Sequence, residues 1–526
     1  MNDLKDETMV GKLPVGIQSF EVLREKEYLY VDKTAMIYKL ASTYSPYFLS
    51  RPRRFGKSLL LSTFEAYFGG RKDLFEGLAI FELETKWEKY PILYLDLNAE
   101  KYDSTECLDL MLSINLENWE KLYGKNESET SLSRRFSGVI ERAYEKTGKR
   151  VVVLVDEYDK PMLNAILDEE LSKKYRTILK AFYGVLKSSG QYLRFLFITG
   201  VTKFAQVSVF SDLNQLVDIS LKLDYASLCG ITKDEILKVF VPYLKLLAQK
   251  QEMSFEEAVE QLKRQYDGYH FAQFSEGVFN PFSLLNSLKF SDFDNHWFQT
   301  GTPTYLVELL KESDYDLQKL IDGVEVKSSD FAEYRADSKN PIPMIYQSGY
   351  LTIKGYDKNY KLYTLRFPNE EVRYGFIEFL VPYYTTITNG DGSFHIVRFC
   401  KDLKAGQTDA FMERMKVFFA KIPYTLNNKN EKHYHAIFYV VFTLMGQYID
   451  AEVCSTGGRA DAVVKTNDYI YLFEFKLNGT AEEAISQIDD KEYLLPYTLD
   501  GRKLVKVGAE FCKRKRNLKR WLIINS

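Results

Sequence analysis

Basic and small residues gather in the run RPRRFGKS at positions 51–58, between a short apolar segment and a stretch typical of an apolar helix. Phosphate-binding loops of the pattern GxxxxGK[ST] occur at such junctions. Backbone N–H groups hold phosphate oxygens there, the lysine reaches the β- and γ-phosphates, and the hydroxyl binds Mg²⁺. Gly56, Lys57 and Ser58 match this pattern, whereas Arg51 stands where the first glycine is expected. On spacing alone, the run predicts a phosphate site or, with equal weight, an ordinary basic turn.

A second candidate lies further along the chain, where the apolar run 151–155 ends in Asp156 and Glu157. In ATP-hydrolysing sites an aspartate at the end of a buried strand binds Mg²⁺, and an adjacent glutamate polarises the attacking water. A solvated acidic turn is the alternative interpretation. Together with the basic loop, and in this order along the chain, the acids predict a site for ATP and Mg²⁺.

A third apolar run, 195–198, is followed by Thr199 and Thr202. A polar residue at the end of a neighbouring central strand is placed to contact the γ-phosphate or the attacking water. Thr202 is the first choice for this role and Thr199 the second. A threonine that only caps the strand end explains either residue equally well.

The C-terminal part carries a different kind of chemistry. Twelve residues separate Asp461 from Glu474, and Lys476 follows two positions later. Two strands of a hairpin can bring the carboxylates together, and strand alternation puts Glu474 and Lys476 on one face. Paired carboxylates suit Mg²⁺, with Mn²⁺ as an alternative; the metal lowers the pKa of a bound water while the lysine orients or deprotonates the nucleophile. An exposed Glu-x-Lys on an edge strand is the common alternative.

The charge is nearly balanced over the 526 residues, with 70 basic and 73 acidic side chains and a formal net charge of -3. The whole molecule is therefore not a polycation that binds nucleic acid by bulk charge. Residues 501–526 differ, because they contain nine basic residues and only one acid, Glu510. This segment predicts a salt-sensitive contact to a nucleic-acid backbone, for which the expected residues are Lys513, Arg514, Lys515 and Arg516. A solvated basic tail carries nearly equal weight.

Cysteine and histidine are scarce, with five of each and no CxxC pair, which excludes a disulfide scaffold and a cysteine-rich zinc module and favours a reducing cytoplasm. The longest apolar run, 436–446, falls short of the ~18 residues that a membrane helix needs. We therefore expect a cytoplasmic protein without a membrane segment.

Several long stretches resemble a bacterial AAA-ATPase-like family, in which RPRRFGKS is the usual form of the loop. They include LPVGIQSFEVLREKEYLYVDKTAMIYKL, YFLSRPRRFGKSLLLSTFEAYFGG, VDEYDKP, ITGVTKF, YDGYHF, NPFSLL, TGTPTYL, QSGYLTIK and FPNEEV. The resemblance covers nearly the whole chain. It implies ATP binding at the matched loop residues, with Asp156 and Glu157 as the acidic pair. Arg53 and Arg54 then either add phosphate contacts, since guanidinium groups suit phosphate oxygens, or point toward a partner.

The pattern GRADAVV followed by YIYLFEFK resembles the site of PD-(D/E)XK nucleases. The resemblance implies a nucleic-acid substrate and matches Gln487, in the helix AEEAISQIDDKEY, to a glutamine that many members carry near the site. Tyr493 extends that pattern, and Glu431 and Glu452 are additional upstream carboxylates.

The expected fold is α/β in three parts. Residues 1–223 are expected to form an AAA-ATPase-like P-loop domain with a parallel sheet. Residues 224–388 form a helical, winged-helix-like section around a hairpin at 351–365, and residues 389–526 an α/β nuclease-like domain. Short uninterrupted apolar runs separated by helices predict the parallel sheet. The turn-rich NGDGS at 389–393 is taken as the last boundary.

The leading hypothesis is an ATPase coupled to a Mg²⁺-dependent nuclease. Its partners are ATP and nucleic acid, with DNA favoured, and a homo-oligomer is left open. The alternative is a nucleotide-controlled switch whose nuclease-like domain binds nucleic acid or a partner without cutting. A chaperone-like remodeller with a basic docking segment ranks third.

Overall fold

The structure is a computed structural model that describes residues 11–98, 101–203, 210, 213, 215–298, 306, 309–310, 313, 315, 317–332, 340–384, 389–420, 431–446, 448–453, 461–477, 479–512 and 517–525. Within these ranges, side chains are described except at 317–318, 321, 381–394, 431–436 and 452–453. The chain forms two compact units. The first comprises Met1–Ser313 and Val324–Glu370, and the second comprises Asp314–Gly323 and Glu371–Ser526. The division into three domains expected from the sequence stays a prediction.

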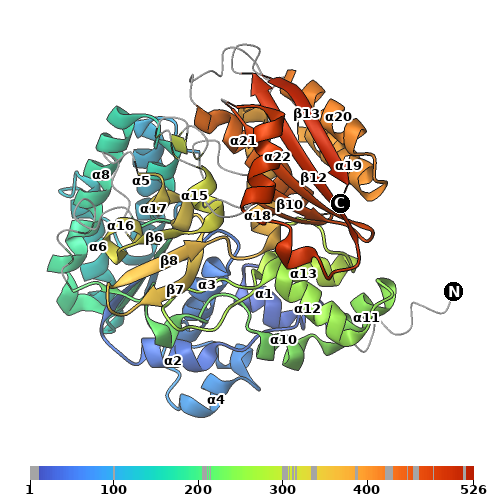
Figure 1. The fold of residues 1–526 in the computed structure, drawn as a ribbon. Helices are drawn as coiled ribbons and strands as arrows, with labels where there is room; N and C mark the ends of the chain where they lie inside the picture. The colour runs from blue at the N-terminus through green and yellow to red at the C-terminus, as the bar shows by residue number, and fades with distance from the viewer. Residues whose placement is uncertain are drawn as a thin grey trace. The chain divides into compact units, whose positions relative to one another are not determined.

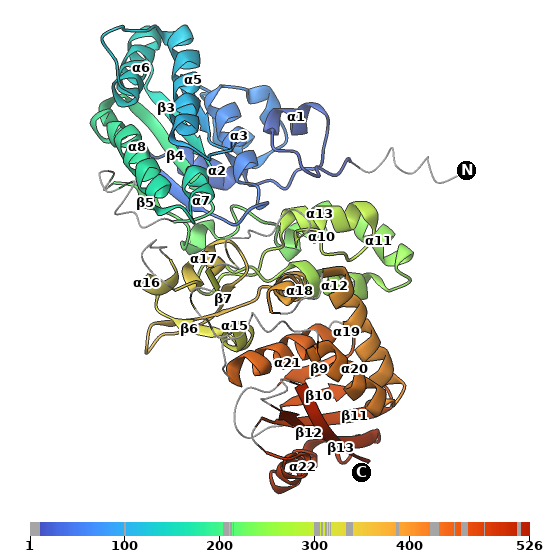
Figure 2. The same ribbon diagram turned by 90° about the horizontal axis from the view of Figure 1, so that it is seen from above.

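The first unit, coloured from blue to yellow in Figure 1, has a five-stranded parallel sheet at its centre, part of which is labelled in Figure 2. Its order is β2-β3-β4-β1-β5, and the strands are β1 (Pro46–Ser50), β2 (Ile92–Asp96), β3 (Val151–Asp156), β4 (Leu193–Gly200) and β5 (Val217–Asp218). Because β4 lies between β1 and β3, its carboxyl end stands between the basic loop that follows β1 and the acids that end β3. The α/β fold expected from the apolar runs is confirmed.

Helices cover both faces of this sheet, which is why β3 is an uninterrupted apolar run up to Asp156 at its end (Figure 2). Helices α5 (Thr105–Tyr123), α6 (Leu132–Thr147) and α8 (Glu169–Ser188) pack together on one face, and α3 (Lys57–Phe68) covers the other. Every residue of β3 is buried. Phe64 and Phe68 of α3 pack on Phe195 of β4, which shows where part of the 15% aromatic content goes.

Shorter elements complete the α/β part. They are α1 (Phe20–Glu25), α2 (Thr34–Ala41), α4 (Ala79–Leu83), α7 (Lys160–Asn164) and the 3₁₀ turns at Lys72–Phe75, Gly190–Tyr192 and Leu223–Tyr225.

The rest of the first unit is helical, with a small sheet, as expected for the middle section. The helices are α10 (Lys233–Val239), α11 (Val241–Lys250), α12 (Phe255–Tyr266), α13 (Pro281–Phe290), α16 (Ser328–Phe331) and α17 (Ile342–Gln347). The small sheet has the order β6-β8-β7, with β6 (Val324–Val326), β7 (Thr352–Asp357) and β8 (Leu362–Arg366). Reciprocal capping boxes begin two of the helices, Thr232 with Glu235 at α10 and Ser254 with Glu257 at α12.

The second unit contains a five-stranded mixed sheet of order β13-β12-β11-β10-β9. The strands are β9 (Asp450–Val453), β10 (Ala462–Lys465), β11 (Tyr469–Lys476), β12 (Lys503–Cys512) and β13 (Asn517–Asn525), and only β11 and β12 pair in parallel. The basic C-terminal segment 501–526, expected as a tail or a backbone contact, therefore contains two strands, β12 and β13.

Six helices accompany this sheet, and a 3₁₀ turn lies at Leu495–Tyr497. The helices are α15 (Leu317–Asp322), α18 (Glu370–Tyr384), α19 (Asn389–Lys404), α20 (Thr408–Ala420), α21 (Glu431–Met445) and α22 (Ala481–Asp490). One face of β11 packs Phe473 and Phe475 against Phe442 of α21, while its other face, with Ile470 and Leu472, packs against α22. The NGDGS segment, expected as a turn-rich boundary, forms the first turn of α19.

Candidate nucleotide site and candidate metal centre

The loop between β1 and α3 turns through two left-handed residues. Gly56, at the N-cap of α3, has φ 89°, and Arg54 has φ 69°. Glycine adopts this region without strain, whereas arginine does so at a cost that proteins accept mainly at functional sites. The turn leaves the first N–H groups of α3 facing the loop, as an anion site requires.

Arg51, which stands at the position of the missing glycine, is a structural anchor. Its guanidinium is 1% exposed and donates to the carbonyls of Ser50 (2.9 Å), Ser220 (2.8 Å) and Tyr225 (3.0 Å). It also lies 4.1 Å from the ring centre of Phe271. These contacts tie the end of β1 to the segment after β5. The spacing of the motif gave no sign of this role, because the partners lie far away in sequence.

Lys57 points back into the loop. Its ammonium donates to the carbonyls of Arg51 (2.9 Å) and Pro52 (3.1 Å) and pairs with Glu157 (3.0 Å). Glu157 itself has a left-handed backbone, φ 52°. The predicted loop lysine and the predicted water-polarising acid thus lie side by side, and each is the charge partner of the other.

Asp156 ends β3 beside two hydroxyl groups. The Thr199 hydroxyl donates to it at 2.6 Å, and the Ser58 side chain is also hydrogen-bonded to it. Burial, and then the charge of Glu157, raise the pKa of Asp156. A hydroxyl and a carboxylate oxygen at one point fit Mg²⁺, a hard cation, so Ser58 and Asp156 are suited to hold it.

Thr202 is fully buried, and its contacts are with Asp159. Its N–H and its hydroxyl both donate to Oδ2 of Asp159, at 2.6 and 2.5 Å, and the N–H of Val201 adds a third donor. Burial and the charge of Glu157 raise the pKa of Asp159 to about 6. A phosphate contact by Thr202 stays a prediction. Thr199, the second choice, lies directly against Asp156.

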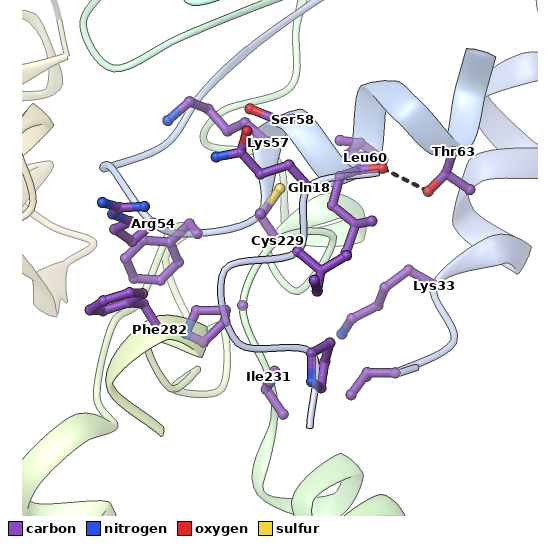
Figure 3. Close-up of a pocket in the computed structure, with 18 of the residues that line it drawn as sticks. Gln18, Lys33, Arg54, Lys57, Ser58, Leu60, Thr63, Cys229, Ile231 and Phe282 are labelled. Atoms are coloured by element: carbon purple, nitrogen blue, oxygen red, sulfur yellow. Dashed lines mark hydrogen bonds between the residues drawn. The ribbon is translucent and has the colours of Figure 1, made fainter. Parts of the chain in front are cut away.

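A cavity of about 370 Å³ opens at this loop (Figure 3). The predicted residues Arg53, Arg54, Gly56, Lys57 and Ser58 line one end together with Glu157. Figure 3 shows Lys57 and Ser58 at the start of α3 and Ile231 on a separate segment across the cavity. The guanidinium of Arg54 lies 4.9 Å from the ring centre of Phe282 on α13.

Besides polar residues such as Gln18, Lys33 and Thr63, the cavity is lined by apolar residues from segments that the sequence did not assign to the site. They are the N-terminal residues Pro14, Gly16 and Ile17, then Leu29 and Val31, Leu228 and Ile231, and Pro281 and Leu285. A cavity lined by both cationic and apolar residues suits a ligand that carries phosphates and a flat base.

In the second unit, the sheet brings the predicted carboxylates together. Ala462 pairs with Phe473, so Asp461 comes next to Glu474 at the ends of β10 and β11. Asp461 accepts a hydrogen bond from the N–H of Phe475 at 2.8 Å, and Lys476 donates to Oε1 of Glu474 at 3.1 Å. Lys476 also donates to Gln487 on α22, whose amide lies 3.5 Å from the Tyr493 hydroxyl.

Glu474 is 3% exposed, and its second oxygen, Oε2, is buried without a hydrogen-bond partner among the described residues. Burial, and then the nearby charge of Asp461, raise the pKa of Glu474 to about 7. A carboxylate oxygen that is buried away from water without a hydrogen-bond donor costs free energy, and a bound cation can offset that cost. Asp461 and Glu474 therefore fit a divalent metal, although the described residues contain no cluster of three metal-ligating side chains.

Several expected residues lie outside the described part of the structure. Lys513, Arg514, Lys515 and Arg516 are among them, as are the side chains of Glu431 and Glu452. Of the five described basic residues in 501–526, four pair with carboxylates: Arg502 with Asp500, Lys506 with Asp489, Lys519 with Glu510 and Arg520 with Glu482. Acids from outside the segment thus neutralise much of its described charge.

Two family models match the chain, a predicted AAA-ATPase over residues 14–210 and the PD-(D/E)XK nuclease superfamily over residues 429–521. These are the two regions that carry the nucleotide cavity and the carboxylate pair. A protein of Azotobacter chroococcum mcd 1, described as "Uncharacterized protein in vnfD 5'region", is 33% identical over 521 residues, covering 96% of this chain and 98% of its own. The chain belongs to the AAA-ATPase-like family with a C-terminal PD-(D/E)XK nuclease domain.

Among solved structures, the ORC2 protein of Aeropyrum pernix, in its ADPNP–ADP complexes, is similar to this AAA-ATPase-like protein at 10% identity and a TM-score of 0.23. The match covers 64% of this chain and 88% of that one. At this TM-score the comparison adds nothing to the fold described above. Among the helices that the structure describes, none has the length and apolar character to cross a bilayer.

Proposed function

We propose that this protein is a P-loop ATPase whose nucleotide state controls a Mg²⁺-dependent PD-(D/E)XK nuclease acting on nucleic-acid phosphodiesters, with DNA favoured. The observation that carries the nuclease half is the buried, unpartnered Oε2 of Glu474 beside Asp461. A domain that had lost its metal would have no reason to keep this oxygen desolvated, since replacing one carboxylate by a neutral residue would remove the cost.

In the ATPase half, each residue has an expected role. The N–H groups after Gly56 and the ammonium of Lys57 hold phosphate oxygens, and Arg53 and Arg54 add guanidinium contacts. Ser58 and Asp156 hold Mg²⁺. When ATP binds, Lys57 contacts a phosphate and releases Glu157, which then accepts the proton of the attacking water.

In the nuclease half, Asp461 and Glu474 would hold a divalent metal, Mg²⁺ or Mn²⁺. When bound, the metal lowers the pKa of a water molecule and neutralises charge on the phosphate. Lys476 is held between Glu474 and Gln487, so its ammonium has a set direction toward the carboxylates, from which it orients the nucleophile. Gln487 fixes that direction, and Tyr493 supports the glutamine.

Coupling between the two halves has a covalent basis. The chain passes between the two units three times, because Asp314–Gly323 belongs to the second unit while the residues on either side belong to the first. Inside the second unit this inserted piece is held by Tyr439, whose hydroxyl donates to Asp322 at 2.7 Å. Movement in the first unit can therefore pull on the nuclease unit at more than one point.

The decisive experiment is a divalent-dependent cleavage assay on a panel of single- and double-stranded DNA and RNA, with and without ATP. Wild type is compared with Glu474→Ala and with Asp490→Ala, an exposed acid on α22 that serves as the control. Cleavage by wild type and the control that is lost in Glu474→Ala supports the proposal. Intact cleavage in Glu474→Ala contradicts the catalytic assignment.

A nucleotide-controlled switch that does not cut is the second candidate, and the Lys57–Glu157 ion pair favours it. An acid that is bound to the loop lysine cannot polarise water, so turnover is slow unless ATP binding separates the pair. Tight ATP binding with negligible turnover, and no cleavage of any substrate with Mg²⁺ or Mn²⁺, would establish this function instead.

We place the protein in the cytoplasm and leave a homo-oligomer open. The four described cysteines, Cys107, Cys229, Cys400 and Cys512, are free, which is compatible with a reducing compartment.

A further inference from the structure

Five basic side chains line the nucleotide cavity: Lys33, Arg53, Arg54, Lys57 and Lys160. Three of them have partners, because Lys33 pairs with Glu235 (2.5 Å), Lys57 pairs with Glu157 (3.0 Å) and Arg54 lies on Phe282. Among the described residues, neither the guanidinium of Arg53 nor the ammonium of Lys160 has a hydrogen bond or an ion pair. Two cations therefore line one cavity without a direct ion pair of their own in the part of the chain that the structure describes.

The backbone places Lys160 at the phosphate end of the cavity. Lys160 follows Glu157 by three residues, and its N–H donates to the carbonyl of Glu157 at 2.9 Å, which folds the chain into a tight turn. Lys160 is the first residue of α7 and is half-buried. Arg53 lies in the loop after β1 and lines the same cavity as Lys160.

The pKa of Lys160 responds to burial and to the charge of Arg53. Burial, and then the charge of Arg53, lower the pKa of Lys160, although Glu157, Asp159 and Asp96 act in the opposite direction. Two like charges held close together repel each other, and an anion between them offsets that repulsion. The γ-phosphate of ATP is an anion of the right kind for this position.

We propose that Lys160 is a catalytic residue of ATP hydrolysis that contacts the γ-phosphate, with Arg53 beside it, and stabilises the charge that develops there. This inference rests on the proposed ATPase function. In the reaction, the water oxygen bonds to the γ-phosphorus, and the bond to the bridging oxygen breaks with its electron pair going to ADP. The water proton passes to Glu157, and Lys160 keeps its own proton throughout.

A cation supplied from within the chain has a kinetic consequence. Stabilising charge on a transferring phosphoryl group is worth about 10³- to 10⁵-fold when an arginine is delivered by a second protein. If Lys160 supplies that charge in the same chain, hydrolysis needs no neighbouring copy. The turnover number is then independent of protein concentration.

The test compares wild type with Lys160→Ala, Lys160→Arg and Lys187→Ala, the last being an exposed lysine on α8 and the matched control. ATP turnover is measured together with the dissociation constants of ADP and of ATPγS by calorimetry. We expect Lys160→Ala to lower kcat by about 10²-fold, as when one charge-stabilising donor is removed. ATPγS binding should weaken by about 10-fold, while ADP binding stays within about 3-fold. Lys160→Arg should recover part of kcat.

The outcomes separate the inference from the function on which it rests. If wild type hydrolyses ATP and Lys160→Ala keeps kcat within about 3-fold, the inference is overturned and the ATPase stands. If wild type binds ATPγS but does not hydrolyse ATP, the affinities alone decide. An unchanged ratio of ATPγS to ADP affinity in Lys160→Ala then overturns the contact between Lys160 and the γ-phosphate. If wild type binds no nucleotide, both proposals fail. Equal loss of ADP and ATPγS binding would show a merely structural role and overturn the inference.

Discussion

In the nucleotide site, Lys57 is paired with Glu157, and Asp156 is hydrogen-bonded to the hydroxyls of Ser58 and Thr199. In the metal centre, Oε2 of Glu474 is buried with no partner among the described residues. The first site satisfies most of its own charges, so a ligand has to replace existing contacts. The second leaves a desolvated oxygen, so a cation adds a contact that is missing.

This difference shows two ways to prepare a site for a charged ligand. Internal pairing holds Lys57 in place and keeps Glu157 away from water until a phosphate takes its partner. Burial of an oxygen that has no partner among the described residues accompanies a pKa of about 7 for Glu474, so metal binding near neutral pH is coupled to proton release. The predictions below test each half of the comparison.

The largest expected effect is on the metal centre. Asp461→Ala or Glu474→Ala removes half of the carboxylate pair, so nucleic-acid cleavage should fall by about 10³-fold or more. ATP affinity should stay unchanged. Gel-based cleavage and nucleotide calorimetry on the same preparations measure both. Loss of ATP binding in these variants would contradict this expectation, because it would show that the metal centre affects the nucleotide site.

Next in size is the effect of Lys57→Ala on the nucleotide site. ATP turnover should be lost, because the variant lacks the phosphate contact and leaves Glu157 buried without its partner. Glu157→Gln should instead keep ATP binding and lower turnover by about 10²- to 10⁴-fold. Phosphate-release kinetics measure the turnover of both variants, and nucleotide affinities show whether each variant still binds ATP. Equal affinities for ATP in Lys57→Ala and wild type would contradict the assigned role of the lysine.

A smaller effect, on stability, is expected at Arg51. Arg51→Gly restores the general form of the loop motif but removes a charged donor from three buried carbonyl groups. It should destabilise the first unit by about 3 kcal/mol or more. Calorimetric unfolding of the full chain measures it, with Arg54→Gly as the control from the exposed part of the loop. If Arg51→Gly unfolds like wild type, the anchoring role is wrong.

The smallest effect concerns pH. The folded-state pKa of Glu474 is about 7, above its ordinary value of 4.5, so the folded protein holds this proton more tightly than the unfolded chain. Stability without divalent metal should therefore fall as pH rises from about 4.5 to 7, because ionisation is disfavoured only in the folded state. Unfolding temperatures in EDTA measure this trend. Glu474→Gln should reduce the fall, and added Mg²⁺ should oppose it in wild type alone.

Local patterns were enough to predict the fold class and the places where the acids and the loop lie. Strand β3 reads as an uninterrupted apolar run because helices cover both faces, and the Asp156–Glu157 pair follows where the strand ends. Alternation along β11 similarly predicts that Glu474 and Lys476 share a face. These features depend on residues close together in sequence, so the sequence carries them directly.

Other contacts depend on residues that the fold brings together from far apart. The buried role of Arg51 needs Ser220 and Tyr225, the bonds of Thr202 need Asp159, and the apolar lining of the cavity needs Pro14 and Ile231. None of these pairs has a spacing rule. The basic C-terminal segment shows the same limit, because its described charges meet acids from α22 and the neighbouring turn.

The sequence by itself thus determined which chemistry each part of the chain can carry, since strand ends, loop residues and strand alternation are local properties. The tertiary structure alone decided which charges are paired and which are not. Arg51 is used for support, Lys57 is held by Glu157, and Arg53 and Lys160 are left facing the cavity. Pairing depends on distance and burial, and these arise only when β1, β3 and β4 lie side by side in one sheet.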